Sequence, residues 1–233
     1  MLLENILRLL LREFSTRDRV AVGDFTRSIG VEEKAVIEAV EVYGLKIEEG
    51  YILVEDWRNF IFNLLEKGFN LEDILRYLYW REFENICEAV LMMAGFYTFR
   101  NLRFKARGRR YEIDVVGVKG DKVLLIDCKK WKRMSSSMLK NAVEKQLERT
   151  RALSETLESV GLHLEYSRIL LIPVIVTMLA GDMAFYDSVP IVPISKLKNF
   201  LYNFENILDK LNVEEVYITR LFERRGSSLE EEG

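Results

Sequence analysis

The stretch RRYEIDVVGVKGDKVLLIDCKKW, residues 109–131, decides the fold of the larger part of this chain. Two apolar runs flank Gly120–Asp121, a dipeptide that favours a two-residue hairpin turn. Each run nevertheless holds an acid, Asp114 in the first and Asp127 in the second, and Lys129 follows the second acid. A buried strand normally excludes unpaired charges, because burying one is costly. These charges therefore either face solvent or share a task.

The turn predicts a register for the hairpin. Counting outward from the loop, Asp114 faces Asp127 and Glu112 faces Lys129. Because side chains alternate along a strand, Asp127 and Lys129 share a face, and Asp114 joins them from the opposite strand. Opposed residues lie roughly 4.5–5.5 Å apart, and two carboxylates at that separation repel. A shared proton would relieve the repulsion, and so would a divalent cation held between the two acids.

The elements predicted around this hairpin give a mixed α/β domain. Its core order is α-β-β-β-α-β, with helices on the faces of a mixed sheet. The strand over 168–178 is apolar throughout and should be central, whereas the prolines in SVPIVPI, residues 188–194, favour an edge strand. The predicted elements are helices over 80–94, 138–160 and 195–211, and strands over 96–104, 168–178, 188–194 and 214–222.

A small helical unit is predicted ahead of this domain. Helices over 2–14, 24–29 (with Asp24 as N-cap) and 31–43 are followed by a hairpin that turns at Glu49–Gly50. This is the order of a winged helix-turn-helix unit. The predicted division is a winged-helix-like domain over 1–55, a helical connector over 56–79, the α/β domain over 80–222 and a flexible tail over 223–233.

Charge is distributed unevenly along a chain whose formal net charge is −3. Residues 100–133 hold twelve Lys and Arg against four acids, a net charge of +8. Residues 1–55 have a net charge of −4, and the helix that would contact DNA in such a unit is acidic. We therefore predict a structural or dimerisation role for this unit in preference to direct DNA binding. The candidate phosphate-binding residues, which could also be simple solubility charges, are Arg103, Lys105, Arg107, Arg109, Arg110, Lys130, Lys132 and Arg133.

The sequence favours a cytoplasmic protein. Residues 1–14 form an amphipathic pattern broken by charges, which is unlike a signal peptide. No uncharged apolar run reaches 18 residues, so no contact with a membrane is expected. Cys87 and Cys128 lie far apart in the sequence, which argues against a disulfide or a zinc site.

Residues 80–177 resemble the PD-(D/E)xK nuclease superfamily. The motifs that carry the resemblance are Phe83–Glu84, Gly95–Phe96, Ile113–Val115, the run from Cys128 to Trp131 after Asp127, and Gln146. The resemblance is closest to archaeal Holliday-junction resolvases and Mrr-like restriction endonucleases. It implies a restriction-endonuclease-like mixed sheet flanked by helices. The second acid is Asp where Glu is commoner, and residues 1–55 lie outside the resemblance.

The resemblance also implies a catalytic site. Asp114 and Asp127 would bind Mg²⁺ or Mn²⁺, with Glu84 completing the site directly or through water. The backbone carbonyl of Cys128 would touch the metal, although its side chain is predicted to be core. Lys129 would orient the attacking water. Gln146 would hold the site or touch a phosphate, and helical spacing places it on the inward face of its helix, where a buried amide needs a partner.

The predicted function is a metal-dependent endodeoxyribonuclease that hydrolyses DNA phosphodiester bonds. Its substrate would be branched DNA or DNA of the kind that restriction endonucleases cut. The alternative is an inactive nuclease-fold protein that binds DNA or acts as a scaffold. Neither function decides whether the protein forms a homodimer, and a homodimer is possible with both. Several residues have structural interpretations: Glu88 as a solvated helix residue, Glu112 as a partner of Lys129 and reserve ligand, His163 as surface or packing, and Trp131 as packing or DNA stacking.

Overall fold

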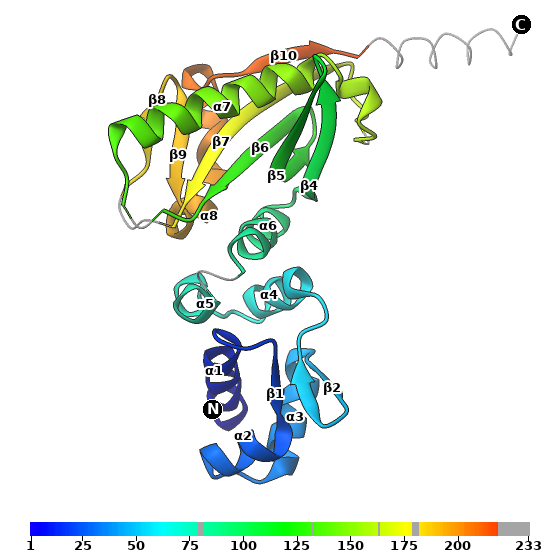
Figure 1. Ribbon diagram of the computed structural model, residues 1–233, viewed down its shortest axis with the longest axis vertical. Coiled ribbons are helices and arrows are strands. Elements are labelled where there is room, and N and C mark those ends of the chain that lie inside the picture. The colour runs from blue at the N-terminus through cyan, green and yellow to red at the C-terminus, as the bar shows by residue number, and fades with distance from the viewer. Residues whose placement is uncertain (79–81, 132, 163, 179–181, 219–233) are drawn as a thin grey trace, which may run out of the picture. The chain divides into compact units, whose positions relative to one another are not determined.

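The chain forms two compact units, Met1–Ala89 and Val90–Gly233, and each is described by itself. The computed structural model describes residues 1–78, 82–131, 133–162, 164–178 and 182–218 (Figure 1). The tail predicted over 223–233 lies outside the described residues. We call Met1–Ala89 the first unit and Val90–Gly233 the second unit.

The first unit combines helices with a small antiparallel sheet of order β1-β3-β2. The three predicted helices and the hairpin are confirmed, and β1 adds a third strand that the sequence did not predict. Asp24 is not the N-cap of α2, because this helix begins at Val22 and Asp24 pairs with Arg27 inside it. The elements are α1 (Leu2–Phe14), β1 (Arg19–Ala21), α2 (Val22–Ile29), α3 (Glu33–Tyr43), β2 (Lys46–Glu48), β3 (Tyr51–Leu53), α4 (Trp57–Glu66) and α5 (Leu71–Leu78), and α6 (Phe83–Met93) crosses into the second unit.

Glu88 in α6 is buried, with 1% of its surface exposed. The prediction of a solvated Glu88 is therefore wrong. Its Oε1 lies 3.6 Å from Nη1 of Arg58 in α4. An ionised carboxylate is buried in this way only with such a partner, and helical periodicity alone could not reveal it.

The second unit is built on a seven-stranded mixed sheet of order β4-β5-β6-β7-β9-β8, with β10 also paired to β7. The predicted mixed sheet flanked by helices is confirmed. Its elements are β4 (Tyr97–Ala106), β5 (Arg109–Lys119), β6 (Lys122–Lys129), α7 (Ser136–Ser154), β7 (Arg168–Thr177), β8 (Ala184–Tyr186), β9 (Val189–Pro193), α8 (Ile194–Asn203), β10 (Glu214–Tyr217) and two short 3-10 helices over Leu157–Ser159 and Phe204–Lys210.

The apolar strand β7 is central, as predicted. It pairs in parallel with β6 and β9 and in antiparallel fashion with β10. The prediction of an edge strand over SVPIVPI is wrong, because β9 lies between β7 and β8 and is buried along its length. Pro190 lies before the first pair with β7 and Pro193 forms the last one, so neither interrupts that ladder.

Helix α7 lies across one face of the sheet (Figure 1). It begins after Ser135, whose hydroxyl accepts a hydrogen bond from the Met138 backbone N–H at 3.3 Å, as predicted for a cap. Ala152 and Leu153 pack into the apolar cluster beneath it. The helix ends at Ser154, earlier than the predicted residue 160, because the chain turns there into a 3-10 helix.

Gly117 lies where β5 packs against the end of α6. A Cβ at this position would lie 2.6 Å from Cδ2 of Leu91 and 3.2 Å from Cδ1 of Phe96, both of which are buried. Gly117→Ala should therefore lower the free energy of unfolding by about 1–3 kcal/mol through overpacking. Urea unfolding followed by circular dichroism measures this. Gly23→Ala is the control, since nothing lies within 4 Å of the added methyl group, and equal stability of the two variants would contradict the expectation.

Candidate active site

The predicted hairpin register is confirmed over the length of the β5–β6 ladder. Pairing runs from Lys119–Lys122 to Val115–Ile126 and stops there. Strand β6 is paired with β7 along its whole length, from Lys122 to Lys129. Asp114 and Asp127 are thus the first residues beyond the last β5–β6 pair, at the fork where β5 leaves β6.

Strand β5 is kinked at Asp114. On its N-terminal side Ile113 enters the apolar cluster under α7, and on its C-terminal side Val116 enters the same cluster, so the alternation of faces shifts by one residue. The opposite residue of β4, Asn101, has a positive φ of 52°. The β4–β5 ladder is paired on either side of Asn101 and Asp114 and is interrupted between them.

Glu112 lies on the far side of this kink and does not face Lys129. The predicted pairing of the two is wrong, because it assumed that β5 and β6 stay paired and alternate without interruption. Glu112 accepts a hydrogen bond from Arg103 of β4 at 2.9 Å instead. Its role as a reserve metal ligand loses its basis.

The Asp114 carboxylate spans the fork between the two strands. Its Oδ2 accepts a hydrogen bond from the backbone N–H of Cys128 at 2.7 Å, in place of a backbone carbonyl of β5. In a strand, the N–H and C=O of one residue point to the same side. The Cys128 carbonyl therefore lies on the Asp114 side of β6, and its side chain is only partly buried.

Asp127 is held between two cations. Its side chain is 2% exposed, and Lys129 Nζ lies 2.8 Å from Oδ1 and 2.7 Å from Oδ2. Arg149 Nη1 of α7 donates to Oδ1 at 2.7 Å. Oδ2 is buried and makes no hydrogen bond, so its contact with Lys129 is an ion pair alone. The fork therefore combines two carboxylates with two flexible, partly exposed cations.

Arg149 is the site residue that the sequence did not predict. It follows Gln146 by three positions, and residues at i and i+3 share a face of a helix. Its Nη1 also lies 3.4 Å from the side-chain oxygen of Gln146. That spacing was the available signal, although it does not distinguish Arg149 from an arginine on the solvent side of the helix.

Gln146 is fully buried on the inward face of α7, as predicted. Its Nε2 donates to the backbone carbonyl of Leu125 at 2.7 Å, two residues before Asp127. This bond ties α7 to β6 directly behind the fork. The geometry gives Gln146 the task of holding strand and helix together.

Glu84 lies in the first turn of α6 and is partly exposed. It belongs to the first unit, whereas the fork belongs to the second. Within the described part of the chain, Glu84 has no hydrogen bond or ion pair. The same residues contain no group of three or more His, Cys, Asp or Glu side chains arranged to hold a metal.

Three of the predicted phosphate-binding arginines are engaged with acids of the same unit. Arg103 pairs with Glu112, Arg109 Nη1 lies 3.5 Å from Glu148, and Arg107 pairs with Glu155 at the end of α7. The hydrogen bond from Arg107 lowers the pKa of the Glu155 carboxyl below its ordinary value. Lys105, Arg110, Lys130 and Arg133 are exposed as well, and Lys132 lies outside the described residues.

Trp131 packs against the apolar cluster that contains Ala142 and Val143 of α7. Of its two interpretations, packing is the one that the structure shows. His163 lies outside the described residues.

The segment around the fork matches a known family model. Residues 79–178 match the family model of the nuclease-related domain. This segment runs from α6 through β7 and contains both acids, Lys129, Gln146 and Arg149. The matched family belongs to the PD-(D/E)xK-like nuclease superfamily, so the match agrees with the sequence motifs at the level of the superfamily.

Similarity to solved structures is distant. A protein of unknown function, AF1548, is 19% identical, with 41% of this chain and 46% of that chain covered and a TM-score of 0.28. Protein VC1899 from Vibrio cholerae is 13% identical, with 87% and 51% covered and a TM-score of 0.35. The chain thus spans about half of the length of each. No curated protein matches the chain, and none of the helices described here is long and apolar enough to cross a membrane.

Proposed function

We propose that the second unit is a metal-dependent endodeoxyribonuclease whose site is the fork of β5 and β6. The observation that carries this proposal is the convergence of Asp114, Asp127 and Lys129 at the one point where the two strands separate. Phosphodiester hydrolysis needs a Lewis acid, an activated water and neutralisation of charge on the phosphate. The nuclease-related domain that spans the fork supports the same chemistry.

The donors at the fork fit a hard divalent cation. Mg²⁺ prefers oxygen ligands and is commonly held by one or two carboxylates, with water and substrate phosphate completing its shell. Asp114 and Asp127 supply the two carboxylates, and the Cys128 carbonyl lies on the same side of β6. We propose Mg²⁺ or Mn²⁺ at this position.

The chain's own groups have distinct tasks in this proposal. A bound cation would supply Lewis acidity and activate water. Lys129 would orient the attacking water and offset the charge that develops on the phosphate. Arg149 and Gln146 would fix Asp127 and β6 in place, because a displacement of about 1 Å can cost a hundredfold in rate.

A second candidate function is a DNA-binding or scaffolding protein that keeps the fold without catalysis. It is favoured by the ion pairs of Asp127, whose single charge is already balanced by Lys129 and Arg149. A cation would have to compete with both. This candidate predicts DNA binding with a steep dependence on salt and no cutting with any divalent metal.

A cleavage assay separates the two functions. The full chain is incubated with linear, flap and four-way-junction DNA in Mg²⁺ or Mn²⁺, with and without EDTA. The nuclease proposal expects cutting of at least one substrate that EDTA abolishes. Selective cutting of the four-way junction would support a junction resolvase, whereas DNA that is bound and left intact under all conditions would favour the second candidate.

The remaining proposals concern assembly and location. A cytoplasmic homodimer fits the sequence, and a resolvase in particular needs two sites on one junction. Residues 1–55 are proposed to supply the interface. Sedimentation of the full chain and of a chain lacking residues 1–55 tests this, since a truncated chain that stays dimeric would exclude that role.

A further inference from the structure

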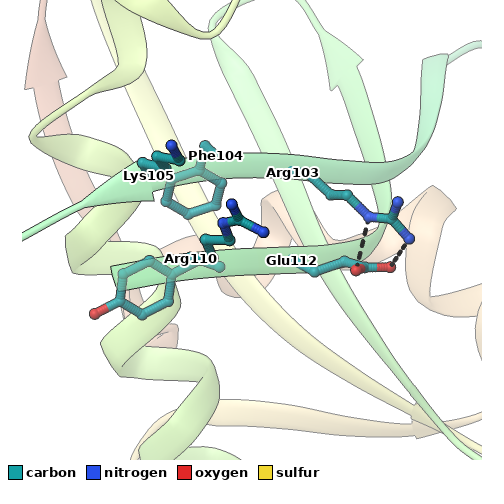
Figure 2. Close-up of a pocket in the computed structure, with 6 residues that line it drawn as sticks. Arg103, Phe104, Lys105, Arg110 and Glu112 are labelled. Carbon is teal, nitrogen blue, oxygen red and sulfur yellow. Dashed lines mark hydrogen bonds and ion pairs between the residues drawn. The ribbon is translucent and has the colours of Figure 1, made fainter. Parts of the chain in front are cut away.

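A cavity of about 530 Å³ opens on the β4–β5 hairpin (Figure 2). It is lined by Arg103, Phe104, Lys105, Arg110, Tyr111 and Glu112. The rings of Phe104 and Tyr111 stack on each other at 5.4 Å and 19°. The Tyr111 hydroxyl lies 3.1 Å from Glu148 of α7, so these rings are engaged with each other and with the helix. Because both rings already have these contacts, the polar side chains of the lining are the groups left to bind a ligand.

The charges in this cavity are unbalanced. Arg103 is neutralised by Glu112, as the dashed lines of Figure 2 show. Lys105 and Arg110 are direct partners in the β4–β5 ladder, and both are exposed. Neither forms an ion pair with any acid in the described parts of the chain. Like charges placed opposite one another across a ladder are destabilising. The Lys105–Arg110 pair should therefore lower the stability of the fold, and no ion pair among the described residues compensates for it.

The other like-charged pair of these hairpins shows the contrast. Lys119 and Lys122 also face each other, next to the β5–β6 turn. Lys122 is paired with Asp121 at 2.7 Å, and Lys119 donates to the Ala94 carbonyl at 2.9 Å. That pair is satisfied within the chain, whereas Lys105 and Arg110 present two unmatched cations to solvent.

The cavity lies on the same strand as the fork. Arg110 precedes Asp114 by four residues, which is roughly 13 Å along a strand. Its side chain and that of Lys105 lie on the face of the sheet turned away from α7, because Tyr111 and Ile113 at the alternate positions pack into the cluster under that helix.

We propose that Lys105 and Arg110 form an anchoring site for a DNA backbone phosphate. The inference rests on the proposed function, because it takes DNA as the occupant. Two adjacent cations that lack internal partners match a phosphodiester strand in charge. Arg103, Arg107 and Arg109, which are paired with acids, contribute little to binding in this assignment.

Salt dependence of DNA binding tests the anchor without any cleavage. Binding of a 30-base-pair duplex is measured in EDTA between 50 and 200 mM salt for the full chain and for Lys105→Ala/Arg110→Ala. Each phosphate that is no longer neutralised lowers the slope of log affinity against log salt by about 0.9, so the variant should lose about 0.9 from the slope. Lys196→Ala/Lys198→Ala, on exposed positions of α8, removes the same charge and should leave the slope almost unchanged.

Lys105→Glu provides a second, independent readout. It replaces the like-charged pair by an opposed pair, so the melting temperature should stay equal or rise while DNA affinity falls. An unchanged slope in the double variant, or an equal fall in the α8 control, overturns the anchor. The anchor is also overturned if the full chain binds inorganic phosphate tightly while neither variant changes the affinity for DNA. A reduced slope in a protein that never cuts DNA supports the anchor and contradicts the nuclease proposal, so the two can fail separately.

Discussion

Asp114→Asn is expected to lower the rate of metal-dependent DNA cleavage by about a thousandfold or more. The substitution removes the carboxylate charge that the cation needs. It keeps an oxygen that can accept the hydrogen bond from the Cys128 N–H, which the native side chain accepts at 2.7 Å. The fork should therefore keep its structure while losing a carboxylate that binds the cation. Single-turnover cleavage of an end-labelled duplex with Mg²⁺, at saturating protein, measures the loss.

The matched control is Asp121→Asn in the turn of the same hairpin. Asp121 is an acid paired with its neighbour Lys122, and it lies away from the fork. This variant should cleave at the rate of the native protein. Comparable rates for Asp114→Asn and Asp121→Asn would show that the fork is not the catalytic site.

Arg149→Met is expected to lower the free energy of unfolding by about 1–3 kcal/mol. Asp127 is 2% exposed and depends on Arg149 and Lys129 for its two ion pairs. Removing one partner leaves a buried charge undercompensated. The Arg149 side chain is 25% exposed, so water replaces part of the lost interaction and keeps the effect below that of a fully buried pair.

A double-mutant cycle assigns this loss to the contact itself. Urea unfolding is compared for the native protein, Arg149→Met, Asp127→Asn and the double variant. Because the amide introduced by Asp127→Asn carries no charge, Arg149→Met should cost less in that background. Arg151→Met, on an exposed position of the same helix, is the control for the loss of an arginine. Full additivity, or an equal loss in the control, would contradict the role assigned to Arg149.

The hairpin could be predicted because its determinants are local. Gly120–Asp121 set the turn, the turn set the register, and the register placed Asp114 and Asp127 directly beyond the same end of the ladder. The kink could not be predicted in this way. It depends on Asn101 of the neighbouring strand and on the separation of β5 from β6 beyond Val115, both of which are tertiary effects. For that reason Glu112 was assigned the wrong partner.

Errors elsewhere have the same origin. Glu88 has the sequence features of an exposed helix residue, yet Arg58 of another helix allows it to be buried. The prolines of β9 are typical of an edge strand, yet they do not interrupt its ladder with β7. Arg149 was missed because helical spacing gives the face of a helix without giving its neighbour. Sequence patterns thus located the acids and Lys129, while Arg149 required the folded chain.

The most direct test of the central claim is the cleavage rate of Lys129→Met beside that of the native protein. Lys129 contacts Asp127 and is 26% exposed, so it can reach a phosphate at the fork. We predict that the native chain cuts duplex or branched DNA with Mg²⁺ or Mn²⁺. We also predict that Lys129→Met binds the same DNA and cuts it at least about a hundredfold more slowly. Equal rates for the two proteins, or a native chain that binds DNA and leaves it intact with every divalent metal, would contradict a catalytic site at the fork.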